Sequence, residues 1–579
     1  MNQLCPRPEH PNPMLERDSW VNLNGEWMFE IDRAVSGVAR GLVESDTLAG
    51  SITLPFCPES TLSGVGDRDF MNAVWYKRKI TLTHEEFAGR RILLHIGAAD
   101  FETRVWVNGK SAGMPHVGSS SPIDLDVTAL VTEGENLITI YCYDDTRAPR
   151  QAGGKQSERY GSFGCFYTRT TGIWQTVWYE SVPADYIKYV SFRPDVSNTS
   201  VHVFCELCGA GALSASVYYE DRLVGTASRD AASVTADMEI KLSEAHLWEL
   251  GKGNLYRVEL AFGMDTVKSY FGLRSIELRD GKFLLNGKSV FQRLILDQGF
   301  YPDGIWTAPN EEVLVKDIEC AMSAGFNGAR LHQKVFEPRF LYHADRLGYM
   351  VWGEYPSWGI DHSDIANLST FLPDWLACVK RDISHPAIVG WCPFNETYDV
   401  GKQEKRQDDA LIRIVYETTK AFDPTRPCID TSGHYHVVTD IYDVHDYEQD
   451  PAILKAHYDT LVSEGTLFEK VKNGHRQHWS GEPVLISEFG GTGFKIAKNN
   501  SETAWGYGKA TLSVREFFER FEGLSHAIMD NPRIMGFCYT QLTDIEQEQN
   551  GLFAYEDRSP KFDPPLLKAI LSHRAAIED

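Results

Sequence analysis

Apolar and polar positions alternate in short runs along residues 1–184, and no run has the period of a long helix. β-Branched and aromatic residues dominate these runs, which is typical of strands. One run ends in Asn108-Gly109, a strong signal for a hairpin turn. Strands are predicted at Ile92–Gly97, Val105–Lys110, Leu137–Tyr143 and Trp174–Tyr179. The pattern predicts a β-sandwich over residues 1–184.

The alternation continues at shorter spacing over residues 185–276. Strands are predicted at Tyr186–Phe192, Val201–Phe204, Ala215–Tyr219 and Leu255–Leu260. Only Ser243–Leu250 has a helical pattern within this stretch. A region of this length with short alternating strands is typical of an immunoglobulin-like sandwich.

From residue 277 to 579 the pattern changes, because short apolar strands now alternate with amphipathic helical segments. Such alternation is typical of a parallel α/β fold, and eight strands predict a (β/α)8 TIM barrel. The predicted strands are Val290–Leu296, Gly328–Leu331, Met350–Glu354, Ile388–Pro393, Cys428–Asp430, Ile441–His445, Val484–Glu488 and Ile534–Gln541. The predicted helices are Glu311–Ala324, Arg339–Leu347, Ala410–Ala421, Ala452–Val471 and Val514–Met529.

Composition narrows the classes of partner. The 579 residues carry a formal net charge of −24, which disfavours nucleic acid and anionic membranes as partners. The first residues lack the basic start and apolar core of a secretory signal, and 11 cysteines are scattered irregularly, so we expect a cytoplasmic protein with reduced thiols. The lone pair Cys205 and Cys208 has no second ligand pair, and no cluster has convincing metal spacing, so we expect neither metal nor cofactor. A homo-oligomer stays open.

Two glutamates each close an apolar strand of the predicted barrel. Glu396 follows the fourth strand directly after Asn395, and Glu488 ends the seventh strand before Phe-Gly-Gly. The carboxyl ends of barrel strands form the face on which active sites lie. Hydrolysis of a glycosidic bond needs one carboxyl group that donates a proton and one carboxylate that attacks or activates water. The alternative is that each glutamate forms a salt bridge or caps a helix.

Several motifs resemble glycoside hydrolase family 2. His385-Pro386 followed by Ile388–Glu396 resembles the acid/base signature of that family, and Ile486–Gly491 resembles its nucleophile signature. Val74–Arg78, Val105–Gly109 and Tyr167–Trp174 resemble its N-terminal sugar-binding sandwich. The order of sandwich, immunoglobulin-like domain and barrel is also that of the family. The resemblance implies a retaining, exo-acting glycosidase in which Glu396 is the acid/base and Glu488 the nucleophile.

Other strand ends supply candidates for the wall of a sugar pocket. The resemblance implies that His332 contacts substrate and that a tyrosine near the nucleophile, for which Tyr447 is the candidate, belongs to the site. Asn395 is placed to hydrogen-bond a sugar hydroxyl, and Trp391 either stacks beneath the sugar or fills the barrel core. The remaining substrate-binding candidates, chosen by their place at a strand end, are Asp297, Glu354 and Gln541.

The substrate is less determined than the reaction. Family β-glucuronidases carry an Asn-x-Lys pair after the eighth strand, where this chain reads Glu546-Gln-Glu-Gln-Asn550 without a lysine. Acidic residues there would repel a uronate, so a terminal neutral sugar is expected. A β-D-galactoside is the default, with an α-L-arabinoside or a β-galactofuranoside as further possibilities. The alternatives are a β-glucuronidase and a non-catalytic carbohydrate-binding protein of the same architecture.

Overall fold

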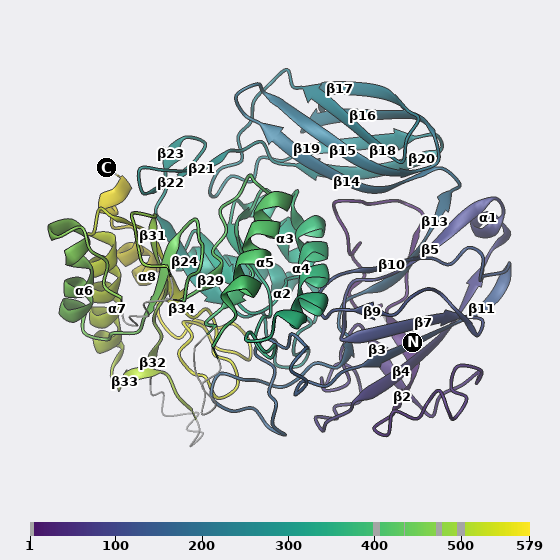
Figure 1. The fold of residues 1–579 in the computed structure, drawn as a ribbon, viewed down its shortest axis with the longest axis horizontal. Helices are drawn as coiled ribbons and strands as arrows, with labels where there is room; N and C mark the ends of the chain where they lie inside the picture. The colour runs from purple at the N-terminus through teal and green to yellow at the C-terminus, as the bar shows by residue number, and fades with distance from the viewer. Residues whose placement is uncertain (1–4, 398–405, 434, 470–476, 495–503, 579) are drawn as a thin grey trace.

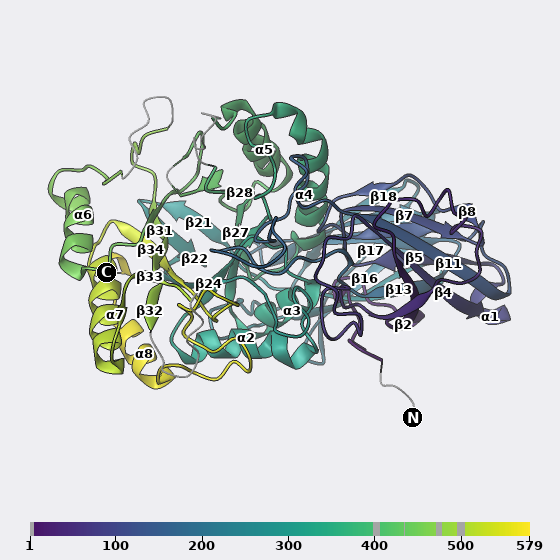
Figure 2. The same cartoon turned by 90° about the horizontal axis from the view of Figure 1, so that it is seen from below.

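The computed structural model describes residues 5–397, 406–433, 435–469, 477–494 and 504–578. Three regions follow one another along the chain, and Figures 1 and 2 show the first sandwich at one end of the molecule, the barrel at the other and the second sandwich against both. This order of sandwich, immunoglobulin-like sandwich and TIM barrel confirms the predicted fold class. The exact boundaries at residues 184 and 276 stay predictions.

The first region is an antiparallel sandwich whose two main sheets enclose Trp27, Tyr76, Ile96 and Ile140. One sheet has the order β1-β13-β5-β10, with β1 at Trp20–Asn22, β13 at Val177–Pro183, β5 at Arg90–Ile96 and β10 at Ile123–Asp126. The other has the order β3-β2-β4-β11-β7-β8, with β3 at Gly50–Leu54, β2 at Gly25–Ile31, β4 at Ala73–Leu82, β11 at Gly134–Tyr143, β7 at Glu102–Val107 and β8 at Lys110–Ser111. Strand β9 (His116–Val117) pairs with β7, β6 (Ala99–Asp100) pairs with β12 (Gly172–Ile173), and α1 covers His84–Phe87.

The second region is the predicted immunoglobulin-like sandwich. A three-stranded sheet is formed by β14 (Tyr186–Asp195), β15 (Ser200–Cys208) and β18 (Thr235–Lys241). It faces a four-stranded sheet of β17 (Arg222–Ala231), β16 (Gly211–Tyr219), β19 (Tyr256–Phe262) and β20 (Asp265–Phe271). The predicted helical segment Ser243–Leu250 is wrong, because these residues form bends and isolated bridges. The indole of Trp248 instead anchors that loop to the backbone of Asp345 in the barrel.

The third region is a barrel of parallel strands. Seven strands pair in the order β27-β26-β25-β24-β34-β31-β30, which span Ile388–Cys392, Met350–Glu354, Gly328–Leu331, Gln292–Asp297, Ile534–Thr540, Val484–Gly490 and Tyr442–Asp446. The fifth strand is short. Cys428 forms a parallel bridge with Trp391, and β29 (Thr431–Ser432) pairs with β28 (Phe394–Asn395). This short strand joins the two edges of the seven-stranded sheet.

Helices cover the outside of the barrel, and five of them lie close to their predicted ranges. These are α2 at Glu311–Ser323, α3 at Pro338–Leu347, α5 at Asp409–Phe422, α6 at Pro451–Ser463 and α7 at Val514–Met529. Helix α6 ends well before the predicted Val471, which lies outside the described residues. Helices α4 (Leu368–Asp382) and α8 (Pro564–Leu571) were not predicted. A proline at position 373 interrupts the local helical signal of α4, whose apolar face is nevertheless buried. The remaining elements are β21 (Ile276–Arg279), β22 (Lys282–Leu285), β23 (Lys288–Ser289), β32 (Thr492–Phe494), β33 (Tyr507–Thr511), η1 (Ile365–Asn367) and η2 (Ala576–Glu578).

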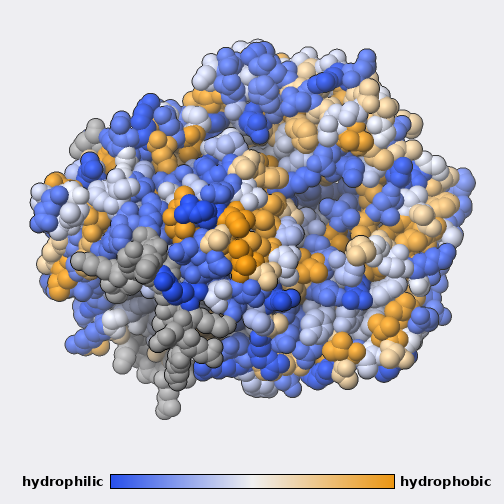
Figure 3. All heavy atoms as spheres, viewed as in Figure 1, coloured by the Kyte–Doolittle hydropathy of each residue, from blue (hydrophilic) through white to orange (hydrophobic). Residues whose placement is uncertain are grey.

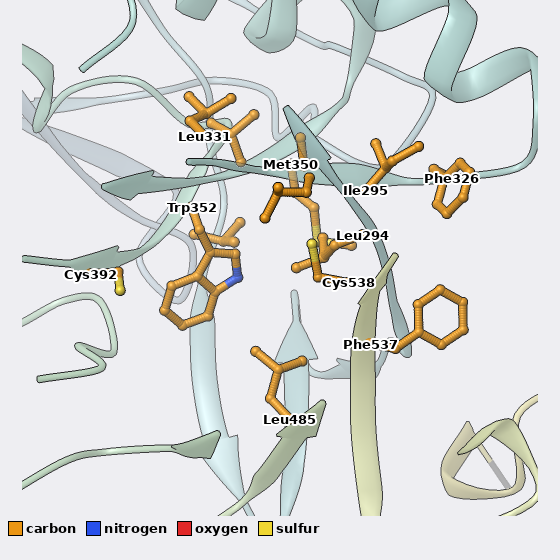
Figure 4. Close-up of a cluster of buried hydrophobic side chains, with 14 of the residues drawn as sticks. Leu294, Ile295, Phe326, Leu331, Met350, Trp352, Cys392, Leu485, Phe537 and Cys538 are labelled. Carbon is orange, nitrogen blue, oxygen red and sulfur yellow. The ribbon is translucent and has the colours of Figure 1, made fainter. Parts of the chain in front are cut away.

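Side chains alternate across each barrel strand, so successive residues face the interior and the helix layer in turn. Figure 4 shows Leu294, Met350 and Cys538 gathered between strands, whereas Ile295 and Phe326 lie together on the other side of the strand. Apolar side chains fill most of this interior, and Gln292 at the amino end of β24 accepts a hydrogen bond from Trp352 at 2.8 Å. The candidate site lies at the opposite end, where the carboxyl ends of the strands meet.

The surface is mostly polar. Figure 3 shows small, separate apolar patches on one face, which is also hollowed below the immunoglobulin-like sandwich. No helix in the described part of the chain is long and apolar enough to cross a membrane.

Candidate active site

Glu396 and Glu488 lie together at the carboxyl-terminal face of the barrel. Glu396 directly follows β28, and Glu488 lies within β31. One carboxylate oxygen of Glu396, one of Glu488 and one ring nitrogen of His445 all lie within 4.8 Å of one another. Retaining glycosidases hold their carboxyl groups about 5–5.5 Å apart, whereas inverting enzymes leave roughly 6.5–9.5 Å for a water molecule. The close approach therefore fits the retaining arrangement.

The backbone fixes the position of Glu396. This residue has a φ of 47°, in the left-handed region that residues other than glycine seldom adopt. Its N–H donates to the carbonyl of Ser432 at 2.8 Å, so the short pair β28–β29 ends at this residue. The ring of His445 lies between the two glutamates, with Nδ1 2.7 Å from Glu396 Oε1 and Nε2 3.5 Å from Glu488 Oε1.

Positive charges surround Glu488. Burial raises the pKa of Glu488, but the positive charges of His445 and Arg330 outweigh it and hold the pKa below its usual value. Burial would lower the pKa of His445, but the two glutamates outweigh it and raise the pKa. Glu488 also accepts a hydrogen bond from Tyr447 Oη at 2.5 Å. These contacts favour an ionised Glu488, which is the form that a nucleophile needs.

Arg330 organises this side of the site, and the sequence analysis did not select it. Its guanidinium donates to Glu354 at 2.7 Å, Glu488 at 2.9 Å and Asn395 Oδ1 at 2.6 Å. The available signal was a charged residue within the apolar strand Gly328–Leu331, because a buried arginine requires acidic partners. Glu354, a predicted pocket residue, uses one oxygen for Arg330 and the other for the N–H of Gln333. Glu354 therefore positions Arg330.

Two of the predicted pocket residues present polar atoms that the protein leaves unpaired. Arg330 fixes the amide of Asn395 through its oxygen, and Nδ2 of that amide is buried without a hydrogen-bond partner. His332 Nδ1 lies 3.0 Å from Glu354 Oε1 but lacks the geometry of a hydrogen bond. Burial holds the pKa of His332 well below its usual value, so the ring is neutral. Buried polar atoms normally have partners, and sugar hydroxyls would supply them.

Two other candidates do not belong to this cluster. Trp391 faces the helix layer, where its indole packs edge-on against Trp375 and donates to Asp423. Asp297 also faces outwards. It accepts a hydrogen bond from the N–H of Gly299, and the charged groups that act on it include Asp317 of helix α2. Both occupy the outward positions of their strands, so their assignment as sugar-contacting residues is corrected.

Gln541 is close to the site but already has partners. Its amide oxygen accepts from Gln298 at 2.5 Å, and its Nε2 donates to Asn550 at 2.8 Å. It links the first strand to the loop that follows the eighth strand. Its structural role is to position that loop.

The first sandwich also contributes to the site, which the sequence analysis did not predict. Tyr167 Oη donates to Glu548 at 2.5 Å, and the Thr168 hydroxyl donates to Glu546 at 2.5 Å. Lys155 reaches the same region, with Nζ 4.2 Å from the ring centre of Trp358. Trp358 in turn donates to the carbonyl of Asn395 at 2.9 Å. The barrel mouth is therefore closed on one side by a loop from the other end of the chain.

Glu396, His445 and Glu488 are the group among the described residues whose spacing would also suit a metal ion. The sequence did not predict this group, because its members are far apart along the chain. The guanidinium of Arg330, 2.9 Å from Glu488, already places a positive charge there and opposes a second cation.

A cavity of ≈ 1060 Å³ lies elsewhere, between β14 and β15 and the ends of α4 and α5. Its barrel residues, such as Ser384, Pro386 and Arg426, precede the fourth and fifth strands. This cavity therefore opens at the amino ends of the strands, away from the two glutamates.

Comparisons with known proteins agree with the fold and the motifs. Three family models match: "Glycosyl hydrolases family 2, sugar binding domain" at residues 60–148, "Glycosyl hydrolases family 2" at 186–274 and "Glycosyl hydrolases family 2, TIM barrel domain" at 276–499. The chain belongs to glycoside hydrolase family 2.

Similar proteins include several named β-glucuronidases. A putative β-glucuronidase of Formosa agariphila is 23% identical over 70% of this chain, and the match spans 50% of that relative. A β-glucuronidase of Streptococcus agalactiae is 23% identical over 93% of this chain and 94% of its own length. A solved Ruminococcus gnavus β-glucuronidase in complex with D-glucuronic acid shares the fold with a TM-score of 0.77, at 18% identity over 96% of this chain and 99% of that one.

Proposed function

We propose that this protein is a retaining, exo-acting glycoside hydrolase. The observation that carries the proposal is the pair Glu396 and Glu488, of which one carboxylate oxygen each lies within 4.8 Å of the other. Glu488 is held ionised by Arg330, His445 and Tyr447. A carbohydrate-binding protein would need neither a proton donor nor a nucleophile, so this arrangement favours the enzyme over the binding-protein alternative.

The reaction proceeds in two steps. Glu488 attacks the anomeric carbon while Glu396, protonated, transfers its proton to the leaving oxygen, so that an alcohol departs and a glycosyl ester forms on Glu488. Glu396, now a carboxylate, removes a proton from water, whose oxygen attacks the same carbon and releases the sugar. Both carboxyl groups return to their initial state. The close spacing of the two groups supports this two-displacement route over direct attack by water.

For the substrate, we propose a terminal β-glucuronide ahead of the neutral sugars expected from the sequence. Relatives named β-glucuronidase support this choice. The argument against a uronate was the acidic loop after the eighth strand. In the structure Glu546 is bonded to Thr168, Glu548 is bonded to Tyr167, and burial raises the pKa of Glu548. The raised pKa makes Glu548 easier to protonate, so it opposes a uronate less than a solvent-exposed carboxylate would.

A panel of p-nitrophenyl glycosides tests both the hydrolase activity and the substrate class. The panel contains the β-glucuronide, β-galactopyranoside, α-L-arabinopyranoside and β-galactofuranoside. We expect turnover of the glucuronide, and loss of turnover by at least about 10³-fold in Glu488→Gln. Mass spectrometry after reaction with a 2-fluoro glycosyl fluoride should show one sugar bound at Glu488. Turnover of a neutral glycoside alone would refute the substrate class but keep the mechanism. Absence of turnover and of labelling across the panel would refute the hydrolase.

A further inference from the structure

Lys155 is a buried cation without an anionic partner in contact. The residue is 7% exposed, and among the described residues no hydrogen bond or ion pair is found for its ammonium. Nζ lies over the face of Trp358, 4.2 Å from the ring centre. A cation–π contact only partly replaces the hydration that a buried ammonium loses. The charge is therefore available to an anionic ligand.

The backbone around Lys155 is rigidly placed against the barrel. The N–H of Gly153 donates to the carbonyl of Trp358 at 2.8 Å, and the N–H of Gly154 donates to the same carbonyl at 3.0 Å. Gly154 has a φ of +58°, and a Cβ there would lie 2.5 Å from the carbonyl oxygen of Gln333. On the other side, Gln156 donates to Asp100 of the sandwich at 2.7 Å. A loop fixed on both sides of one residue presents that side chain in a defined place.

The Lys155 side chain lies beside the candidate active site. Trp358, beneath the ammonium, donates to the carbonyl of Asn395, the residue before the acid/base. Burial would lower the pKa of Lys155, but Cys165 and the carboxylates of Glu548, Glu488 and Glu396 outweigh it and raise the pKa. Lys155 therefore lies on the side of the barrel mouth formed by Trp358 and by Asn395, which is next to Glu396 in the chain.

We propose that Lys155, supplied by the first sandwich, binds the carboxylate of an acidic sugar in this pocket. The inference rests on the proposed hydrolase function and names the group that selects its substrate class. Arg330 is unsuitable for this role because Glu354, Glu488 and Asn395 already occupy its donors. The loop after the eighth strand offers Glu548 and Asn550, which bond to each other, and no cation. Among the described residues around the two glutamates, Lys155 is the cation that remains to be paired.

Two substrates that differ only at C6 provide the test. p-Nitrophenyl β-D-glucuronide and p-nitrophenyl β-D-glucoside have the same ring stereochemistry, but the first has a carboxylate where the second has CH2OH. In Lys155→Met, which keeps the length and removes the charge, kcat/KM for the glucuronide should fall about 100-fold. The value for the glucoside should change by less than about threefold, because no charge pair is lost. Lys155→Arg should retain most of the glucuronide activity.

A second measurement uses only the wild-type protein, so it stays informative if Lys155→Met does not fold. In the wild-type protein, D-glucuronate should inhibit at least about tenfold more strongly than D-glucose, and rising salt should weaken only the glucuronate. Equal losses on both substrates in Lys155→Met, or equal inhibition by the two sugars, would overturn the role of Lys155 while leaving the hydrolase intact. Absence of turnover and of Glu488 labelling with any glycoside would instead refute the proposed function itself.

Discussion

The hydrogen bond from Tyr447 to Glu488, the proposed nucleophile, permits a quantitative test of the charge state of the site. Tyr447 Oη lies 2.5 Å from Glu488 Oε2 and 3.0 Å from Thr540 Oγ1, and its ring stacks on Tyr507. Tyr447→Phe removes one donor from the carboxylate and leaves the ring in place. A hydrogen bond to a charged group contributes about 1.5–3 kcal/mol.

The expected direction follows from which form of Glu488 reacts. The donor stabilises the ionised carboxylate, so its loss raises the pKa of Glu488, which other groups hold below the usual value. At 1.36 kcal/mol per unit, the pKa should rise by about 1–2 units. Activity falls as pH decreases through this pKa, so the acidic limb of the kcat/KM profile should move to higher pH by the same amount. At neutral pH most of Glu488 stays ionised even after this rise, so the loss of kcat/KM should be largest on the acidic limb and small at pH 7.

The assay is kcat/KM for the best aryl glycoside from pH 4 to 9, measured for the wild type, Tyr447→Phe and a matched control. Tyr458→Phe serves as that control, because Tyr458 Oη also donates to a buried carboxylate, Asp446, but does not touch Glu488. The control should leave the acidic limb in place. An unshifted acidic limb in Tyr447→Phe, or equal shifts in both variants, would refute the argument that Tyr447 stabilises the ionised nucleophile.

Two further predictions concern stability. His436 lies 2.8 Å from Asp430 Oδ1 and 3.2 Å from Asp443 Oδ1; burial would lower its pKa, but these carboxylates raise it to about 10. The stabilisation from the charged ring is complete below the unfolded pKa of about 6.5 and is lost as pH rises towards 10. In urea unfolding, the free energy of unfolding of the wild type should therefore fall by about 3 kcal/mol more than that of His436→Gln over this pH range. Parallel pH curves for the two proteins would contradict this. Trp391→Phe should lower the free energy of unfolding by about 2 kcal/mol, because it removes packing and the bond to Asp423, yet leave kcat/KM within about twofold; a large loss of kcat/KM without loss of stability would return Trp391 to the site.

Local patterns were sufficient to predict the order of regions and to select Glu396 and Glu488 as candidate carboxyl groups. Alternation in the two sandwiches and the later change to strands and helices predicted the observed element order, because each period reports which face of an element is buried. Glu396 and Glu488 were predictable because each ends an apolar strand, and parallel strands in a barrel end on one face.

Tertiary structure decided which other residues lie next to Glu396 and Glu488. Trp391 and Asp297 lie at strand ends as predicted, but which parity of a barrel strand faces inwards depends on closure of the whole sheet, and both residues face the helices. The role of Arg330 depends on three partners from other strands.

The contribution of Lys155 lay furthest beyond sequence reasoning. Its loop belongs to the first sandwich, and no hydrophobic period or motif in that loop indicates a contact with the barrel. Only the packing of Gly153 and Gly154 against the residues after β26 brings the ammonium beside Trp358. The sequence by itself determined the two carboxyl groups and the elements that carry them, because these follow from local burial. The charge around those groups was decided by contacts between distant segments, which local burial does not encode.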